Sequence, residues 1–137
     1  GSRARPRVIV IDASVVLELL LRTPASPAIE ARLLDSAETL HAPHLLDVEV
    51  AQVLRRYAAR NEISAMRGRR ALEILARFPI TRYPHEPLLS RIWSLRTNMT
   101  AYDAAYVAVA EALGATLVTR DERLSTAAGS RAKIELV

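Results

Sequence analysis

The stretch Val8-Ile9-Val10-Ile11-Asp12-Ala13-Ser14 is an apolar run that ends abruptly on a carboxylate. Four consecutive β-branched residues predict a strand that is buried on both faces, as in the parallel sheets of α/β proteins. Asp12 then lies where the strand leaves the sheet. Because open α/β sheets bind their ligands at that edge, Asp12 is the first candidate for a functional residue.

Length and composition fit one folded domain. The chain has 137 residues, of which 50% are hydrophobic and 25% charged, a composition typical of globular proteins and not of disordered ones. We expect residues 3–137 to form a single domain and Gly1-Ser2 to be a remnant of cloning. The lack of Cys excludes disulfides, thiol catalysis and Cys-based zinc sites, and it fits a cytoplasmic protein. No apolar run approaches the roughly 20 residues of a membrane span.

The basic residues are nearly all arginine, and Lys133 is the only lysine. The net charge is +4, and the guanidinium group of Arg binds phosphate through a planar fork, so a polyanionic partner such as RNA is compatible with this surface. An arginine-rich surface that serves only solubility explains the same charge, and the two interpretations stay open here.

Strand-like and helix-like patterns alternate along the chain. Strands are predicted at residues 8–11, 39–42, 79–83, 115–119 and 133–136, and helices at 14–21, 26 to about 36, 45–60, 64–77, 87–96, 101–113 and 122 to about 127. This alternation predicts an α/β fold, with a mostly parallel sheet of about five strands and helices on both faces.

These patterns also predict the positions of individual side chains. We expect Ser14 to cap the helix that follows it. Trp93 and the tyrosines are expected in the core and not as a platform for stacking bases. The apolar positions of the helix over residues 64–77 are Met66, Leu72, Ile74 and Leu75.

Four acids are predicted where strands end or helices begin: Asp12, Glu49, Asp103 and Asp121. Each alone has a purely structural explanation, such as a cap or a turn. In a parallel sheet, however, these positions share one edge. Asp47 is excluded because it points roughly 160° away from Glu49 on the same helix. Glu111 lies about 12 Å along its helix from Asp103, and we expect it to face solvent.

Clustered carboxylates repel one another unless some are protonated or a cation lies between them. Oxygen ligands without His or Cys select Mg²⁺ or Mn²⁺ over zinc. The pattern therefore predicts a divalent-metal site, and such sites commonly serve phosphate chemistry.

At this point the sequence resembles the PIN-domain ribonucleases, in particular the VapC toxins of bacterial toxin–antitoxin pairs, over nearly the whole chain. The stretches that carry the resemblance are Val10-Ile11-Asp12-Ala13-Ser14, Asp47-Val48-Glu49-Val50, Tyr102-Asp103-Ala104-Ala105-Tyr106-Val107-Ala108 and Leu117-Val118-Thr119-Arg120-Asp121. Any one of them is weak, whereas their order and spacing together are specific.

The resemblance implies a three-layer α/β/α sandwich and a metal-dependent endoribonuclease. It implies that Asp12, Glu49, Asp103 and Asp121 hold one or two Mg²⁺ or Mn²⁺ ions, and that metal-activated water cleaves the RNA to leave a 5′-phosphate and a 3′-hydroxyl. Supporting hydroxyls or amides are expected from Ser14, Thr119, Asn98 and Thr100, and phosphate contacts from Arg120 and Arg123.

The resemblance also implies a homodimer and a cognate antitoxin that neutralises the toxin. Apolar side chains in residues 15–21, 28–34 and 50–57 are candidates for a groove that binds an antitoxin helix. One departure is Glu122, which follows the fourth acid where relatives carry basic residues; we interpret it as a helix-start acid.

Two other functions compete. The first is a catalytically inactive PIN-fold module that binds RNA or an antitoxin, against which the retention of all four acids argues. The second is a phosphorylatable receiver domain, which needs paired acids after the first strand and a Lys near the last. Here Asp12 has no acidic neighbour, and Lys133 precedes its strand.

Overall fold

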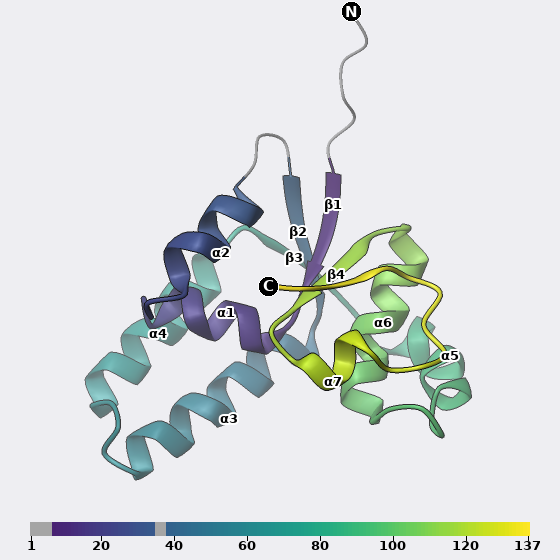
Figure 1. The fold of residues 1–137 in the computed structure, drawn as a ribbon. Coiled ribbons are helices and arrows are strands. Elements are labelled where there is room, and N and C mark those ends of the chain that lie inside the picture. Colours follow the sequence, from purple (N-terminus) through teal and green to yellow (C-terminus); the bar gives the residue numbers. More distant parts are fainter. Residues whose placement is uncertain (1–6, 35–37) are drawn as a thin grey trace, which may run out of the picture.

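The computed structural model describes residues 7–34 and 38–137, and a parallel sheet of five strands lies at its centre (Figure 1). Gly1-Ser2 and the predicted helix end near Ser36 lie outside the described residues. The strand order is β3-β2-β1-β4-β5, and all neighbours pair in parallel. The strands are β1 (Arg7–Ile11), β2 (Glu38–Pro43), β3 (Ile80–Tyr83), β4 (Thr116–Thr119) and β5 (Ile134–Leu136). The predicted parallel sheet is thus confirmed, and the opening stretch forms its middle strand.

Helices cover both faces of the sheet, which gives the predicted α/β/α sandwich (Figure 1). One group packs together on one side: α1 (Ala13–Leu20), α2 (Ser26–Leu33), α3 (Leu45–Ala59) and α4 (Ala65–Arg77). The other side holds the 3₁₀ turn η1 (Glu86–Leu88), α5 (Leu89–Ser94) and α6 (Ala101–Leu113), and α7 (Glu122–Ser125) lies against β4 and β5. Within the described ranges, no helix combines the length and apolarity that crossing a membrane requires.

The core lies between β1 and the helices on either side. Val10 and Ile11 are fully buried, as the β-branched run predicts. On one face α6 presents a continuous buried surface from Ala104 to Ala110, whose small alanines let the helix approach β1, β2 and β4 closely. Gly114 ends α6 in the left-handed conformation at φ 62°, as predicted for a helix stop.

Three of the four apolar positions identified in α4 are exposed. Leu75 is buried, but Met66, Leu72 and Ile74 are exposed. The buried stripe consists instead of Gly68, Ala71 and Leu75. The reason is that α4 packs mainly on α3 and α1, so a narrow face with small residues is covered.

Trp93 is exposed as well, contrary to the expectation that it lies in the core. Its side chain is 68% exposed, and the guanidinium of Arg96 lies 4.8 Å from the ring centroid. The helix predicted over residues 87–96 is shortened to α5 behind the turn η1, and so it buries fewer side chains.

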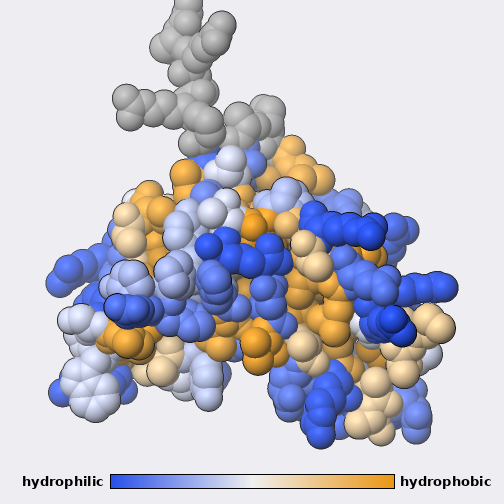
Figure 2. Space-filling view, turned by 180° about the vertical axis from the view of Figure 1, so that it is seen from behind, coloured by the Kyte–Doolittle hydropathy of each residue, from blue (hydrophilic) through white to orange (hydrophobic). Residues whose placement is uncertain are grey.

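From behind, apolar residues reach the surface between flanks of charged ones (Figure 2).

Glu111 does not face solvent as predicted. The guanidinium of Arg91 donates to both of its carboxylate oxygens, at 2.7 and 2.9 Å, and the backbone N–H of Arg131 donates at 2.7 Å. These bonds lower the pKa of Glu111, the bond from Arg91 most of all. Glu111 therefore ties α6 to α5 and to the segment before β5.

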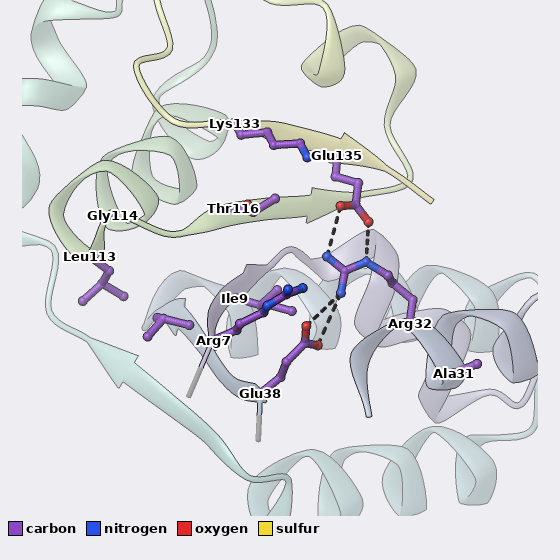
Figure 3. A pocket seen from close by; sticks show the side chains of 11 residues that line it. Arg7, Ile9, Ala31, Arg32, Glu38, Leu113, Gly114, Thr116, Lys133 and Glu135 are labelled. Carbon is purple, nitrogen blue, oxygen red and sulfur yellow. Dashed lines mark hydrogen bonds and ion pairs between the residues drawn. The ribbon is translucent and has the colours of Figure 1, made fainter. Parts of the chain in front are cut away.

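At the edge of the sheet where the strands begin, Arg32 of α2 lies between two glutamates (Figure 3). Its guanidinium donates to Glu135 of β5 at 2.5 and 3.0 Å and to Glu38 of β2 at 3.1 and 3.3 Å. A cavity of about 920 Å³ opens beside this cluster, with Arg7 and Lys133 on its walls. Arg32 thus joins α2 to two strands on opposite sides of β1.

Candidate active site at the carboxyl edge of the sheet

Asp12 lies at the end of β1 and is 7% exposed. Its Oδ1 accepts a hydrogen bond from the Ser14 hydroxyl at 2.5 Å and one from the backbone N–H of Val15 at 3.3 Å, and its Oδ2 accepts one from the Thr119 hydroxyl. Asp12 is therefore the N-cap of α1. The prediction that Ser14 caps this helix is wrong, because Ser14 donates to the carboxylate that does so.

Glu49 lies in α3 and points toward α6. The hydroxyl of Tyr106, which is buried, donates to Glu49 Oε1 at 2.5 Å. Asp47 points elsewhere, as its helical phase predicts, and binds the guanidinium of Arg82 at 2.8 and 3.1 Å. The sequence reasoning missed Tyr106. Its position three residues after Asp103, on the same side of a helix, is the signal that identifies it.

Asp103 and Asp121 each begin a helix. The Thr100 hydroxyl is the N-cap of α6 and accepts from the backbone N–H of Asp103 at 3.1 Å. Asp121 is the N-cap of α7 and accepts from the backbone N–H of Arg123 at 2.9 Å. The Thr119 hydroxyl accepts from the N–H of Asp121 at 3.0 Å while donating to Asp12, so one buried threonine links two of the acids.

The acids lie within range of one another's charge. Burial is the main cause that raises the pKa of Asp12, Glu49 and Asp103, and repulsion from neighbouring carboxylates raises each further. Asp103 is the common neighbour, because its charge acts on Asp12 and Glu49 while that of Asp121 acts on Asp103. Hydrogen bonds from Ser14 and Thr119 oppose the shift at Asp12. The four predicted acids thus form one electrostatic group.

The chemistry of these donors suits a hard divalent cation, since all of them are carboxylate oxygens. Among the described residues, no three acidic, histidine or cysteine side chains lie close enough together to ligate a single ion as they stand. Like charges repel, so carboxylates draw together only around a cation. The donor set therefore fits Mg²⁺ or Mn²⁺, whereas a preformed cage is not seen.

The remaining predicted residues fall into two groups. Asn98 and Thr100 line a cavity of about 180 Å³ beside Asp103, together with Arg123, whose side chain is 86% exposed. Arg120, in contrast, lies 3.5 Å from a carboxylate oxygen of Glu18 and donates to the backbone carbonyl of Val137 at 3.1 Å. Of the two arginines, Arg123 is the one that lies beside the acids, because its guanidinium is 3.6 Å from a carboxylate oxygen of Asp121.

Comparison with known proteins identifies the family. Residues 9–130 match the PIN domain family. VapC ribonuclease Mb0985 of Mycobacterium bovis is 48% identical over 130 residues, which cover 95% of this chain and 98% of that protein. Among solved structures, PAE2754 from Pyrobaculum aerophilum matches with a TM-score of 0.68 at 25% identity, covering 95% of this chain and 84% of that one.

A second solved structure, VapBC2 from Rickettsia felis bound to a DNA fragment from their promoter, matches with a TM-score of 0.70 and covers 95% of this chain and 98% of that one. At 14% identity this likeness shows the fold alone. The match over residues 9–130 and the 48% identity to a ribonuclease of nearly the same length agree with the α/β/α sandwich and its acidic edge. The chain therefore belongs to the PIN-domain family, among its VapC ribonucleases.

Proposed function

We propose that this protein is an endoribonuclease toxin that hydrolyses RNA phosphodiester bonds with Mg²⁺ or Mn²⁺ and is neutralised by a cognate antitoxin. The observation that carries the proposal is the group of four acids, which come from four separate elements and interact through Asp103. The 48% identity to a VapC ribonuclease supports the reaction class. The resemblance to VapC toxins supports two further proposals, a single PIN domain over residues 3–137 and a homodimer.

The side chains of this chain have distinct roles in such a reaction. Ser14 and Thr119 fix both oxygens of Asp12, and Tyr106 fixes one oxygen of Glu49, so two metal ligands are held before RNA binds. Arg123 is placed to hold a backbone phosphate beside Asp103. A divalent cation bound by the acids would lower the pKa of a water molecule and offset the negative charge that develops on the phosphate.

The competing function is an inactive PIN-fold module that binds RNA or an antitoxin. The clustered acids argue against it, because burial and, to a smaller extent, mutual repulsion raise the pKa of Asp12 and Glu49, and a bound cation would offset both. A binding module has no use for that arrangement.

Metal-dependent cleavage tests the proposal directly. We expect the wild-type protein to cut RNA in Mg²⁺ or Mn²⁺, to stop in EDTA, and to resume when excess Mg²⁺ is added. Mapping of the new ends is expected to find 5′-phosphates and 3′-hydroxyls. RNA that stays intact in Mg²⁺ and in Mn²⁺, while the protein is folded by circular dichroism, would contradict the enzyme and favour the binding module.

We propose that the antitoxin binds an apolar groove of about 320 Å³ that lies away from the acids. Two of the predicted segments contribute to it, with Leu19 and Leu20 from α1, Leu33 at the end of α2 and Leu34 directly after it. The third segment, residues 50–57, is not among its lining. Ile74 of α4, Phe78 and Pro79 after it and Leu40 of β2 contribute instead. Leu34 and Ile74 are exposed in this groove, and apolar side chains in a groove suit the apolar face of an amphipathic helix.

A charged residue in this groove is expected to weaken inhibition by the antitoxin without changing the rate of RNA cleavage. Ile74→Glu should weaken antitoxin binding by roughly 10- to 100-fold, because the complex loses a buried isoleucine and must desolvate a carboxylate. Titration of RNA cleavage with the antitoxin measures this, and the uninhibited rate should match that of the wild type. Met66→Glu is the matched control, since Met66 is also exposed on α4, 60% against 48% for Ile74, but does not line the groove. Equal inhibition of both variants would place the antitoxin elsewhere.

A further inference from the structure

Tyr102 is an exposed aromatic residue immediately next to one of the acids. It lies in the first turn of α6, directly before Asp103, and is 61% exposed. The expectation that the tyrosines lie in the core holds for Tyr106 but is wrong for Tyr102. The fold gains little from burial of the Tyr102 ring, so its position calls for another explanation.

Helical geometry places Tyr102 on the side of α6 that faces Glu49. Tyr102 and Tyr106 are four residues apart, so their side chains lie on the same side of α6, about one turn from each other. Because the Tyr106 hydroxyl donates to Glu49, Tyr102 lies one turn farther out at the rim of the acidic edge. Val48, directly before Glu49, is also exposed. Asp103 and Glu49 thus each directly follow an exposed hydrophobic residue, which is Tyr102 and Val48 respectively.

The other flank of Asp103 is polar and basic. The cavity there is lined by Asn98, Thr100 and Arg123. The Arg123 guanidinium lies 3.6 Å from a carboxylate oxygen of Asp121, and its side chain is 86% exposed. The acids therefore have a cation on one side and an aromatic face on the other. A nucleotide has the complementary parts, because its phosphate is anionic and its base offers a flat π-face for stacking.

We propose that the Tyr102 ring stacks on the base of a nucleotide adjoining the phosphate that is cut, and that it contributes to substrate binding and to base preference. This inference rests on the proposed ribonuclease function. Tyr102 acts on the substrate and not on the fold, since its ring is exposed in the free protein. Stacking depends on the ring and not on the hydroxyl, which separates this role from that of Tyr106.

The test compares Tyr102→Phe with Tyr102→Leu on single-stranded RNA oligonucleotides that differ in the bases next to the cleaved bond. We expect Tyr102→Phe to cleave like the wild type within about twofold, because the ring is kept. Tyr102→Leu should raise KM about tenfold with a smaller change in kcat, as loss of one stacked base weakens binding at least about fivefold. The differences in rate between flanking bases should also shrink in Tyr102→Leu.

A binding assay separates failure of this inference from failure of the ribonuclease proposal. Affinity for a fluorescein-labelled single-stranded RNA is measured by anisotropy in the Asp12→Asn background, with and without Tyr102→Leu. Weaker binding with Tyr102→Leu supports stacking even if the wild type cuts no RNA. Unchanged KM and unchanged affinity in an active enzyme would overturn the inference alone. Trp93→Leu removes another exposed aromatic residue as a control, and an equal loss there would overturn the assignment to Tyr102.

Discussion

Asp103→Asn is expected to lower RNA cleavage by more than about 100-fold while leaving the protein folded. The charge of Asp103 acts on Asp12 and Glu49, and that of Asp121 acts on Asp103, so its loss removes the shared member of the group. Loss of residues that merely support metal ligands already costs roughly 10- to 100-fold, and loss of a ligand should cost more. The change keeps the size of the side chain, and the Thr100 cap survives because it uses the backbone N–H of residue 103.

Stability distinguishes loss of chemistry from loss of fold in this variant. Burial and repulsion from Asp121 raise the pKa of Asp103, which means that its charge disfavours the folded state without a cation. Asp103→Asn should therefore unfold at the same temperature as the wild type or a higher one in EDTA. Glu122→Gln is the matched control, since Glu122 is an exposed acid beside Asp121 that we interpret as a helix-start residue, and its activity should stay within about twofold. Normal activity in Asp103→Asn would refute the assignment of the acids.

The positions of the acids were predictable because they follow from local pattern and from one topological rule. A β-branched run fixes β1 as a central strand, and parallel strands end at a common edge, so Asp12 and Asp121 had to approach each other. Glu49 was separated from Asp47 by helical phase alone. The Asp47–Arg82 pair shows that this inference was sound.

The hydroxyl bonds at the site were less predictable, since they join side chains that are distant in sequence. Tyr106 contacts Glu49 across 57 residues, and Thr119 contacts Asp12 across 107. The periodicity of a helical sequence identifies the apolar face of the helix, but it does not identify the element against which that face packs. It therefore listed Met66 and Ile74 as apolar positions without showing that both are exposed on a helix that packs mainly on α3 and α1. The same limitation left α4 out of the expected antitoxin groove.

Arg32→Leu is expected to cause the largest loss of stability among the substitutions considered. The Arg32 guanidinium bonds two carboxylates from different strands, and the Glu38 side chain is only 1% exposed. Leucine would leave that carboxylate buried without a partner. Removal of one member of a buried ion pair costs about 3 to 5 kcal/mol, and the lower figure applies because the Arg32 side chain is 31% exposed. The midpoint of thermal unfolding should fall by roughly 10 °C.

The pH dependence of this loss follows from Glu135. The hydrogen bond from Arg32 is the main cause that lowers the pKa of Glu135 below its ordinary value of 4.5. A depressed pKa in the folded state stabilises the protein at pH above the ordinary value, and that stability disappears as the pH falls through the folded pKa. The difference in unfolding free energy between wild type and Arg32→Leu should therefore be constant near pH 7 and narrow below about pH 4.5.

Two matched variants show whether the planar guanidinium of Arg32, and not only its positive charge, is needed to hold β2 and β5 together. Arg32→Lys should recover only part of the stability, because an ammonium group cannot bond two carboxylates through a planar fork. Arg69→Leu breaks an exposed pair with Glu73 at 3.5 Å, and it should change the unfolding free energy by less than about 1 kcal/mol. If urea unfolding found Arg32→Leu no less stable than Arg69→Leu, the cluster at this edge would be a surface ion pair and α2 would be held by its apolar contacts alone.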